Sequence, residues 1–212
     1  HKTMLPDKYV ITIGRSFGSG GRALGRMIAE RLGIAFYDKM LLVKAAEKAG
    51  YNIEYFEQGD ERVPRIMGSI IPFSMGFYPM SWVGDSTGGN TDRVYKAQCD
   101  FIHDLANGEP CVIVGRSADY VLRDVDNVVN IFVHAPIDEC AKRIVGRHDT
   151  ETLDEARALA ERTNKLRANF YNFYTDKRWG HATSYDLCID SSTMPLEKLA
   201  DFIINYIHLR LE

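Results

Sequence analysis

The stretch that decides the fold is Gly14-Arg15-Ser16-Phe17-Gly18-Ser19-Gly20-Gly21-Arg22, called the glycine loop below. It follows a short β-branched run at residues 9–13, which predicts a buried strand. After the loop, apolar residues recur at helical spacing as far as Gly33, which predicts a helix. In a glycine-rich turn between a strand and a helix, backbone N–H groups and the helix N-terminus converge on one point and can bind an anion there. The glycine loop therefore predicts a phosphate site.

The composition is that of one globular domain. The chain has 212 residues, of which 45% are hydrophobic and 26% charged, and its net charge is -3. This length suits a single α/β domain, which we place over residues 8–212. The slightly acidic charge gives no reason to expect a nucleic-acid partner, and no apolar run reaches the roughly 20 residues that span a membrane. The oligomeric state stays open.

The cysteines and histidines show no metal-site pattern. The four cysteines are scattered without a C-x-x-C pair, and the six histidines form no H-E-x-x-H motif. Free cysteines of this kind are usually small buried side chains, so we assign no residue as a metal ligand. Reduced thiols make the cytoplasm the expected compartment.

Four further apolar runs alternate with helical patterns. Each run is continuous, as strands buried on both faces of a sheet need to be. Parallel strands require helical crossovers, so this order predicts an α/β fold with a doubly wound, five-stranded parallel sheet. Ligands of such sheets bind at the carboxyl ends of the strands. The runs are residues 34–37, 111–115, 128–134 and 185–190, and helices are expected at 39–50, at 91–106, from 137 to about 174, and at 196–211.

Two segments depart from this alternation. Residues 59–90 mix proline, glycine, methionine and aromatic residues without a period, and they predict a loop-rich insert over 51–90. Residues 142–178 carry nine Lys or Arg and six Asp or Glu, although the chain as a whole is acidic. This segment predicts a helical lid over polyphosphate at 142–180. The alternative is a solvated helix whose charges pair with one another.

The glycine spacing fits two kinds of nucleotide site. The Gly-x-x-x-Gly-x-Gly pattern from residue 14 also suits short-chain dehydrogenases, in which Asp38 would hold a ribose hydroxyl. Enzymes of that class need a Tyr-x-x-x-Lys pair to move a proton, and no tyrosine in this chain has a lysine four residues later. Tyr174 has Arg178 in that place, and arginine stays protonated. The pattern therefore favours a phosphate-transfer site.

The chain resembles the cytidylate kinase-like family along nearly its whole length. The resemblance is carried by ITIGRSFGSGGR at 11–22, FYDK at 36–39, VIVGRSAD at 112–119 and YDLCID at 185–190. The arginine of VIVGRSAD also looks like that of the Gly-Arg-Asp motif of cytidylate kinases, which holds the nucleoside monophosphate. The resemblance implies a bacterial-type P-loop kinase that uses ATP and Mg²⁺ and phosphorylates a nucleoside monophosphate, CMP or dCMP. Its partners would be a nucleotide donor and a small-molecule acceptor, with the insert on the acceptor side.

The resemblance also implies roles for individual residues. The donor phosphates would be cradled by Arg15, Ser16, Gly18, Ser19, Gly20, Gly21 and Arg22. The acceptor would be held by Asp38, Arg116, Asp119 and Arg178. The charge of the transferred group would be neutralised by the candidate catalytic residues Arg22, Arg116, Arg143, Arg147 and Arg167.

One departure from the family pattern bears on the chemistry. Aligned without a gap, the phosphate-binding lysine falls on Gly21 and the magnesium-binding Ser or Thr falls on Ala23. Arg22 or Arg15 would then supply the cation, and magnesium would depend on the loop serines, a downstream carboxylate or water. Two alternatives therefore stay open, a nucleotide-binding regulatory module without catalysis and a kinase for a non-nucleotide small molecule.

Overall fold

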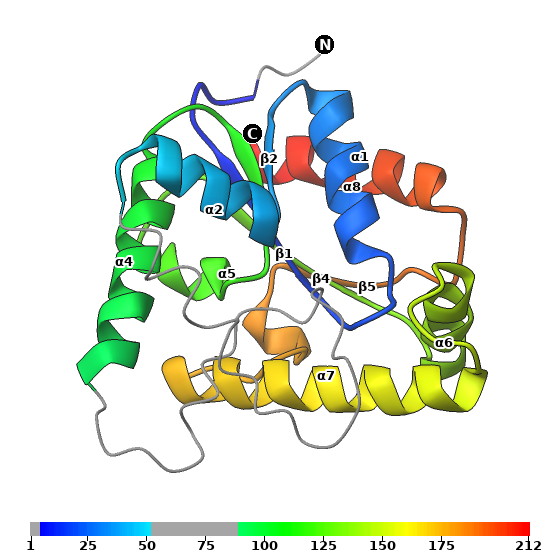
Figure 1. The fold of residues 1–212 in the computed structure, drawn as a ribbon. Helices are drawn as coiled ribbons and strands as arrows, with labels where there is room; N and C mark the ends of the chain where they lie inside the picture. The colour runs from blue at the N-terminus through cyan, green and yellow to red at the C-terminus, as the bar shows by residue number, and fades with distance from the viewer. Residues whose placement is uncertain (1–4, 52–88) are drawn as a thin grey trace.

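The computed structural model describes residues 5–51 and 89–212 of the chain. Their centre is a sheet of five parallel strands in the order β2-β3-β1-β4-β5 (Figure 1). The doubly wound parallel sheet is confirmed, whereas nearly all of the insert predicted at 51–90 lies outside the described residues. The strands are β1 Val10–Arg15, β2 Ala35–Tyr37, β3 Cys111–Val114, β4 Val128–His134 and β5 Leu187–Asp190.

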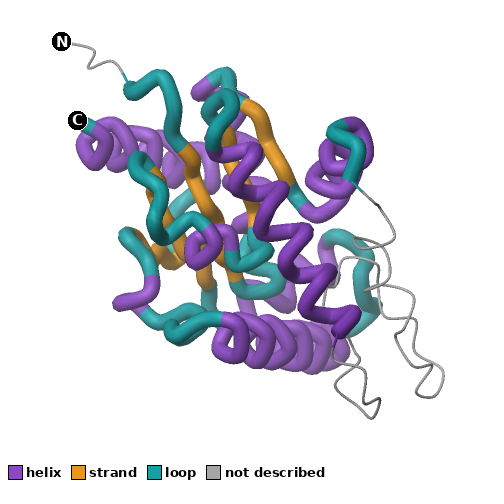
Figure 2. Tube along the Cα trace, turned by 90° about the vertical axis from the view of Figure 1, so that its left-hand side faces the viewer, coloured by secondary structure: helices purple, strands orange, loops and turns teal. Residues whose placement is uncertain are grey.

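Helices cover both faces of this sheet (Figure 2). On one face α1 and α8 bury an apolar stripe against Ile11 and Ile13 of β1. On the other face α4 and α5 pack against Val10, because successive side chains of a strand point to opposite faces. The helices are α1 Gly21–Leu32, α2 Lys39–Lys48, α4 Gly89–Ala106, α5 Ala118–Val121, α6 Ile137–Gly146, α7 Leu153–Tyr174 and α8 Leu196–Leu211, with a 3₁₀ turn at Ala182–Ser184.

The connections after β1 and β3 lead to opposite faces of the sheet. The glycine loop after β1 enters α1, which packs on the same face as α8. The turn after β3 enters α5, which packs beside α4 on the other face. Because β1 and β3 are neighbours, a crevice opens between their carboxyl ends. This crevice is where parallel α/β sheets bind ligands.

Two helices pack beside the glycine loop at this carboxyl edge. The helical stretch predicted from 137 to about 174 is two helices, and α7 runs across the lower edge of the sheet in Figure 1. Thr152 begins α7 in a reciprocal capping box with Glu155, which explains the break after α6. Phe17 of the glycine loop packs between α6 and α7, against Ile144 and Leu159. The loop therefore rests on a small core of its own.

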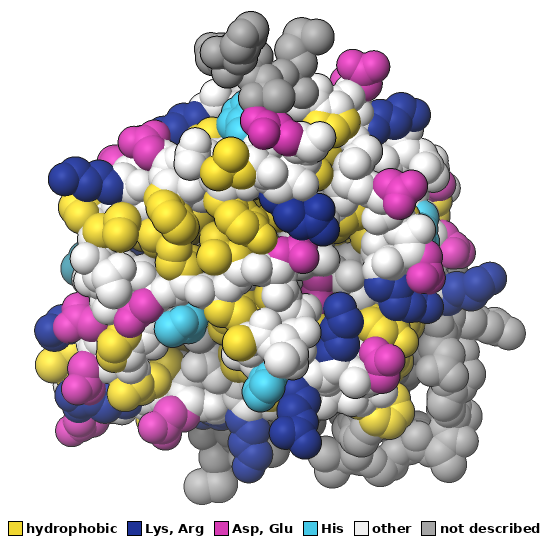
Figure 3. Space-filling model, turned by 180° about the vertical axis from the view of Figure 1, so that it is seen from behind, with side chains coloured by type: hydrophobic (Ala, Val, Ile, Leu, Met, Phe, Trp, Pro, Cys, Tyr) yellow, Lys and Arg dark blue, Asp and Glu magenta, His cyan; other side chains and the backbone are white. Residues whose placement is uncertain are grey.

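The last helix shows both a buried and an exposed apolar side. Ile203 and Ile207 are fully buried on the inward stripe that the sequence predicts. Phe202 and Leu209 of the same helix are 49% and 63% exposed, and apolar side chains gather on the back of the molecule where α8 lies (Figure 3). Within residues 5–51 and 89–212, no helix is both long enough and apolar enough to cross a bilayer.

Candidate functional site

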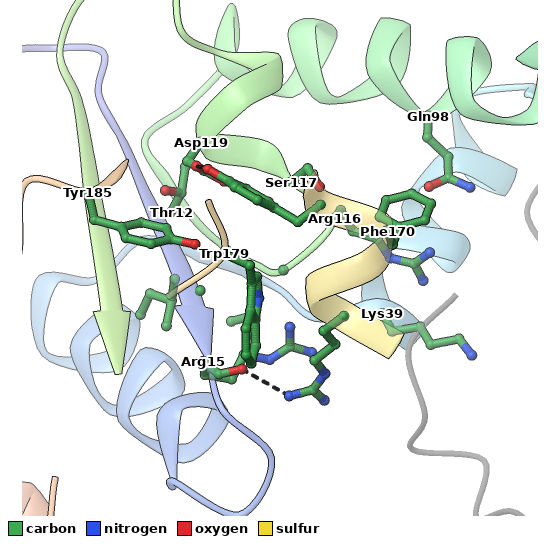
Figure 4. A pocket seen from close by; sticks show the side chains of 16 residues that line it. Thr12, Arg15, Lys39, Gln98, Arg116, Ser117, Asp119, Phe170, Trp179 and Tyr185 are labelled. Carbon is green, nitrogen blue, oxygen red and sulfur yellow. Dashed lines mark hydrogen bonds between the residues drawn. The ribbon is translucent and has the colours of Figure 1, made fainter. Parts of the chain in front are cut away.

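Two adjoining cavities open at the carboxyl edge of the sheet. The first, the loop cavity, has a volume of about 430 Å³ and lies along the glycine loop. The second, the inner cavity, has a volume of about 60 Å³ and lies between the ends of β1 and β3 (Figure 4). Four residues line both cavities, so the two form one site with a shared wall: Arg15, Lys39, Val114 and Arg167.

The loop cavity carries the charge of an anion site. Five cationic side chains and two carboxylates line it. Each carboxylate is bound by an arginine, since Asp38 lies 2.6 Å from Arg22 and Asp149 lies 2.6 Å from Arg147. The remaining positive charge faces the N-terminus of α1, where backbone N–H groups and the helix dipole also favour an anion.

The glycine loop holds its shape through its own hydrogen bonds. Ser19 Oγ donates to the Ser16 carbonyl oxygen over 2.8 Å, and the Phe17 amide donates to Asn164 Oδ1 of α7 over 2.7 Å. Gly18 and Gly20 both have φ near +80°, in the left-handed region that glycine adopts without a steric penalty. The loop is therefore shaped before any ligand binds, which lowers the entropic cost of binding.

Arg15 crosses the site from the end of β1. A Cβ atom built on Gly21 would lie 2.6 Å from Arg15 Cβ, so the side chain begins directly over Gly21. A Cβ atom built on Gly115 would lie 2.5 Å from Arg15 Nη1, so the guanidinium ends beside the turn after β3. Arg15 thus spans the wall between the two cavities.

Arg22 points elsewhere. Its Nε donates to Asp38 Oδ2 over 2.8 Å, and 62% of its side chain is exposed. Asp38 is buried, and its other oxygen accepts the Leu41 amide over 3.0 Å as the N-cap of α2. Burial alone would raise the pKa of Asp38, but the hydrogen bonds from the Leu41 amide and from Arg22 hold it below its ordinary value. Asp38 is predicted to hold the acceptor substrate, but both of its carboxylate oxygens already bind groups of the protein.

Replacing Asp38 tests its structural role. Asp38→Ala removes the N-cap acceptor of α2 and is expected to lower the free energy of unfolding by about 1 kcal/mol. Asp38→Asn keeps an acceptor for the Leu41 amide and should lose less, because asparagine caps helices as well as aspartate does. Urea denaturation of the two variants and the parent measures both losses. Equal losses in the two variants would contradict the capping role.

The predicted lid arginines have different surroundings. Arg167 is 6% exposed, its Nη1 donates to the Arg15 carbonyl oxygen over 3.0 Å, and its guanidinium lies 5.5 Å from the centre of the Phe17 ring. Arg147 reaches the same ring from the end of α6. Arg143 instead binds the Ser19 carbonyl and Ser191, and Arg178 is exposed beyond α7. In the described part of the chain neither of these last two lines either cavity.

A strained turn presents Arg116 at the inner cavity. Gly115, Arg116 and Ser117 have φ of +79°, +63° and +51°, and such left-handed backbone is costly for the two residues that carry a Cβ. Both terminal nitrogens of Arg116 are shielded from solvent. The turn leads into α5, a four-residue helix that the apolar periodicity does not predict. The strain is thus located at a residue that lines the inner cavity and that the sequence predicts to bind the acceptor.

Aromatic residues and a buried carboxylate complete the inner cavity. Tyr171 donates to Asp119 Oδ2 over 2.6 Å, and Tyr185 lies beside Tyr171 with their ring centres 6.2 Å apart. Burial raises the pKa of Asp119, although the Tyr171 hydroxyl and the charge of Lys177 partly offset this. Sequence reasoning placed Asp119 here but missed most of its neighbours, because single aromatic and polar residues have no telling spacing. The lining residues it missed include Thr12, Lys39, Gln98, Phe170, Tyr171, Trp179 and Tyr185 (Figure 4).

The raised pKa of Asp119 predicts a pH dependence of stability. The folded state binds the proton of Asp119 more tightly than the unfolded state does, so protonation of Asp119 stabilises the fold. This stabilisation is fully present below the unfolded pKa of about 3.9. It is lost as the pH rises through the folded pKa. Asp119→Asn cannot ionise and keeps an oxygen that accepts from Tyr171. Its stability relative to the parent should therefore increase from pH 4 to pH 7 in urea titrations, and a pH-independent difference would contradict the burial of a charge.

The site offers few protein ligands for magnesium. The described residues hold no cluster of three acidic, histidine or cysteine side chains, and both carboxylates of the loop cavity are bound by arginines. Ser16 Oγ is buried against the Cys140 thiol and has no nitrogen or oxygen partner among the described residues. Mg²⁺ often keeps several waters and binds mainly through substrate phosphates. The residues present therefore fit an ion that substrate phosphates and water would hold.

Comparison with known proteins shows to which family the chain belongs. The model of the cytidylate kinase-like family matches residues 10–193. The chain belongs to this family. It is 27% identical over 191 residues to a cytidylate kinase from Pyrococcus horikoshii, a match that covers 89% of this chain and 83% of that one.

Solved structures share the fold. A protein of Eubacterium ventriosum superimposes with a TM-score of 0.69 at 27% identity, covering 94% of this chain and 98% of that one. A shikimate kinase from Acinetobacter baumannii, solved with shikimate, superimposes with a TM-score of 0.52 at 13% identity, covering 98% of this chain and 96% of that one. The second likeness shows the P-loop kinase fold alone.

Proposed function

We propose that this protein transfers the γ-phosphoryl group of ATP to a nucleoside monophosphate, CMP or dCMP. The observation that carries the proposal is the pair of adjoining cavities with a shared cationic wall. A donor in the loop cavity and an acceptor in the inner cavity would meet at Arg15 and Arg167. Membership of a kinase-like family and the similarity to a cytidylate kinase support the same reaction.

The residues divide the work of an in-line transfer. The α1 amides and the cations of the loop cavity would hold the donor, with Mg²⁺ on its phosphates neutralising charge when bound. Arg116 would hold the acceptor phosphate. An acceptor phosphate oxygen attacks the γ-phosphorus, the bond to the β,γ-bridging oxygen breaks, and ADP and a nucleoside diphosphate leave. Arg167, which lines both cavities, would neutralise the transferred group.

Two other functions remain candidates because the loop departs from its family pattern. Ala23 has no hydroxyl, and glycine stands at the lysine position, which would suit a nucleotide-binding regulatory module without catalysis. The small inner cavity would suit a non-nucleotide acceptor of the same kinase chemistry.

A coupled assay separates the three functions. Full-length protein is mixed with ATP, Mg²⁺ and each of CMP, dCMP, UMP, AMP and GMP, and ADP and nucleoside diphosphate are both quantified. We expect turnover with CMP or dCMP above the ATPase background. Transfer only to another hydroxyl compound would favour the non-nucleotide kinase. Nucleotide binding without any transfer, from folded protein beside a working control kinase, would overturn the proposal and favour the regulatory module.

A further inference from the structure

Compared with the general P-loop pattern, the glycine loop has a glycine and a cationic residue in swapped positions. That pattern is G-x-x-x-x-G-K-[ST], in which the lysine reaches the β- and γ-phosphates. With Gly20 as its second glycine, the first glycine falls on Arg15 and the lysine falls on Gly21. An arginine thus stands where the pattern has a glycine, and a glycine stands where it has the cation.

The two exchanged positions touch in the folded protein. A Cβ atom on Gly21 would lie 2.6 Å from Arg15 Cβ and 3.2 Å from Arg15 Cγ. Carbon atoms pack at about 3.5–4.0 Å, so a side chain at position 21 and the Arg15 side chain cannot both keep these places. The glycine at 21 is therefore the condition for the arginine at 15 to lie where it does.

A second glycine makes room for the charged end of Arg15. A Cβ atom on Gly115 would lie 2.5 Å from Nη1, 3.1 Å from Cζ and 3.3 Å from Nη2 of that arginine. The guanidinium therefore occupies the space that a side chain at Gly115 would take in the turn after β3. The path of Arg15 requires glycine at both of its ends, in two segments that are 94 positions apart in the sequence.

The backbone of Arg15 is anchored on two sides. Arg15 is the last residue of β1, where it pairs with Val133 of β4. Its carbonyl oxygen accepts from Arg167 Nη1 over 3.0 Å. The point from which the Arg15 side chain starts is therefore fixed.

The neighbouring cation of the loop is committed to another contact. Arg22 binds Asp38 through Nε and Nη2, at 2.8 and 2.6 Å. Moving it over the loop would cost the buried Asp38 carboxylate its nearest cation and leave it Arg26 at 3.9 Å and the Leu41 amide. Arg15 already lines both cavities, so it is the better placed of the two.

We infer that Arg15 supplies the phosphate-binding cation of the glycine loop in place of the usual lysine, and that Gly21 and Gly115 are glycines because its side chain passes over both. The ligand is the β,γ-phosphate portion of a nucleoside triphosphate. The inference deepens the proposed function and rests on it for the identity of the donor. Phosphate binding itself requires no transfer, so the two can be tested apart.

A reciprocal exchange of residues tests the inference. The variants are Arg15→Gly, Gly21→Lys and the double variant Arg15→Gly/Gly21→Lys, which restores the first glycine and the lysine of the general pattern. Their affinities for ATP and for inorganic tripolyphosphate are measured by calorimetry, with adenosine as the phosphate-free probe. Arg15→Gly is expected to weaken binding of both phosphate ligands about tenfold or more, because it removes a charge-assisted, two-pronged donor. Gly21→Lys should weaken it similarly by displacing Arg15, and the double variant should return to within about threefold of the parent.

Matched controls separate local effects from general ones. Arg31→Gly removes an arginine that bridges α1 to Glu197 and Asp201, outside both cavities. Gly146→Lys adds a lysine at the end of α6, where no atom lies within 4 Å of the new Cβ. Both should bind tripolyphosphate like the parent. If Gly21→Lys does not fold, Arg15→Lys decides the question, since it should keep binding within about fivefold while Arg15→Gly does not.

The outcomes distinguish this inference from the proposed function. Parent-like tripolyphosphate binding in Arg15→Gly, or a double variant no better than Arg15→Gly, overturns the role of Arg15. The expected binding pattern in a protein that transfers no phosphoryl group supports the role of Arg15 and overturns the proposed function. If Arg15→Gly keeps its turnover with an unchanged KM for ATP, the proposed function is supported and the role of Arg15 is overturned.

Discussion

Replacing Arg167 by methionine is expected to lower kcat/KM of the proposed phosphoryl transfer about 1,000-fold, or roughly 4 kcal/mol of transition-state stabilisation. Arg167 is the buried arginine that lines both cavities. A cation between donor and acceptor acts on the charge of the group in flight, where burial strengthens its effect. Methionine keeps most of the apolar stem that packs near Phe17, so the loss reports the guanidinium.

Two further variants make this result specific. Arg167→Lys keeps a charge but loses the planar fork that reaches the Arg15 carbonyl, and it should recover only part of the activity. Arg157→Met removes a half-buried arginine of the same helix, which pairs with Asp138 and Asp154 and lines neither cavity, and it should keep parent activity. Steady-state kinetics in both substrates, with thermal unfolding of each variant, provide the measurement. A loss of less than tenfold in folded Arg167→Met would contradict a role in the transfer.

Gly18→Ala is expected to lower the free energy of unfolding by about 3 kcal/mol. Gly18 has φ of +81°, which costs an L-residue about 1–2 kcal/mol. Its new Cβ would also lie 2.8 Å from the Cys140 carbonyl oxygen and 2.9 Å from Ile144 Cδ1, and such overpacking costs about 1–3 kcal/mol. The backbone carbonyl of α6 cannot turn aside as a flexible side chain would, so the loop must shift.

Gly33→Ala provides the matched comparison. Gly33 ends α1 with φ of +66°, but nothing lies within 4 Å of its Cβ position. It should lose only the cost of a left-handed backbone for alanine, about 1–2 kcal/mol. Urea denaturation of the two variants isolates the packing contribution of α6 against the glycine loop. Equal losses would show that α6 does not constrain the loop.

The sheet could be predicted from the sequence because its strands are buried on both faces. Such strands need continuous apolar runs, and the runs at β1, β3 and β4 are recognisable for that reason. The short helix α5 could not be predicted. It has only four residues, too few for an apolar period to show. It begins directly after the left-handed turn at Arg116 and Ser117, which the sequence pattern does not predict either.

The site was predictable in its composition but not in its orientation. The sequence pointed to a group of arginines, and Arg15, Arg22, Arg116, Arg147 and Arg167 do line the cavities. Arg143 and Arg178 carry the same charge in the same predicted lid, yet among the described residues neither of them lines either cavity. Charge and spacing locate a side chain on an element, whereas packing decides which way it points.

The sequence by itself determined the architecture and predicted an anion site, because apolar runs and glycine-rich turns are local patterns that can be read within a few residues. Only the tertiary structure decided how the loop departs from its family pattern. Arg15, Gly21 and Gly115 are co-adapted through space, since one side chain occupies room that two glycines leave. The sequence shows a missing lysine at position 21, and the folded chain shows the Arg15 side chain starting directly over that position.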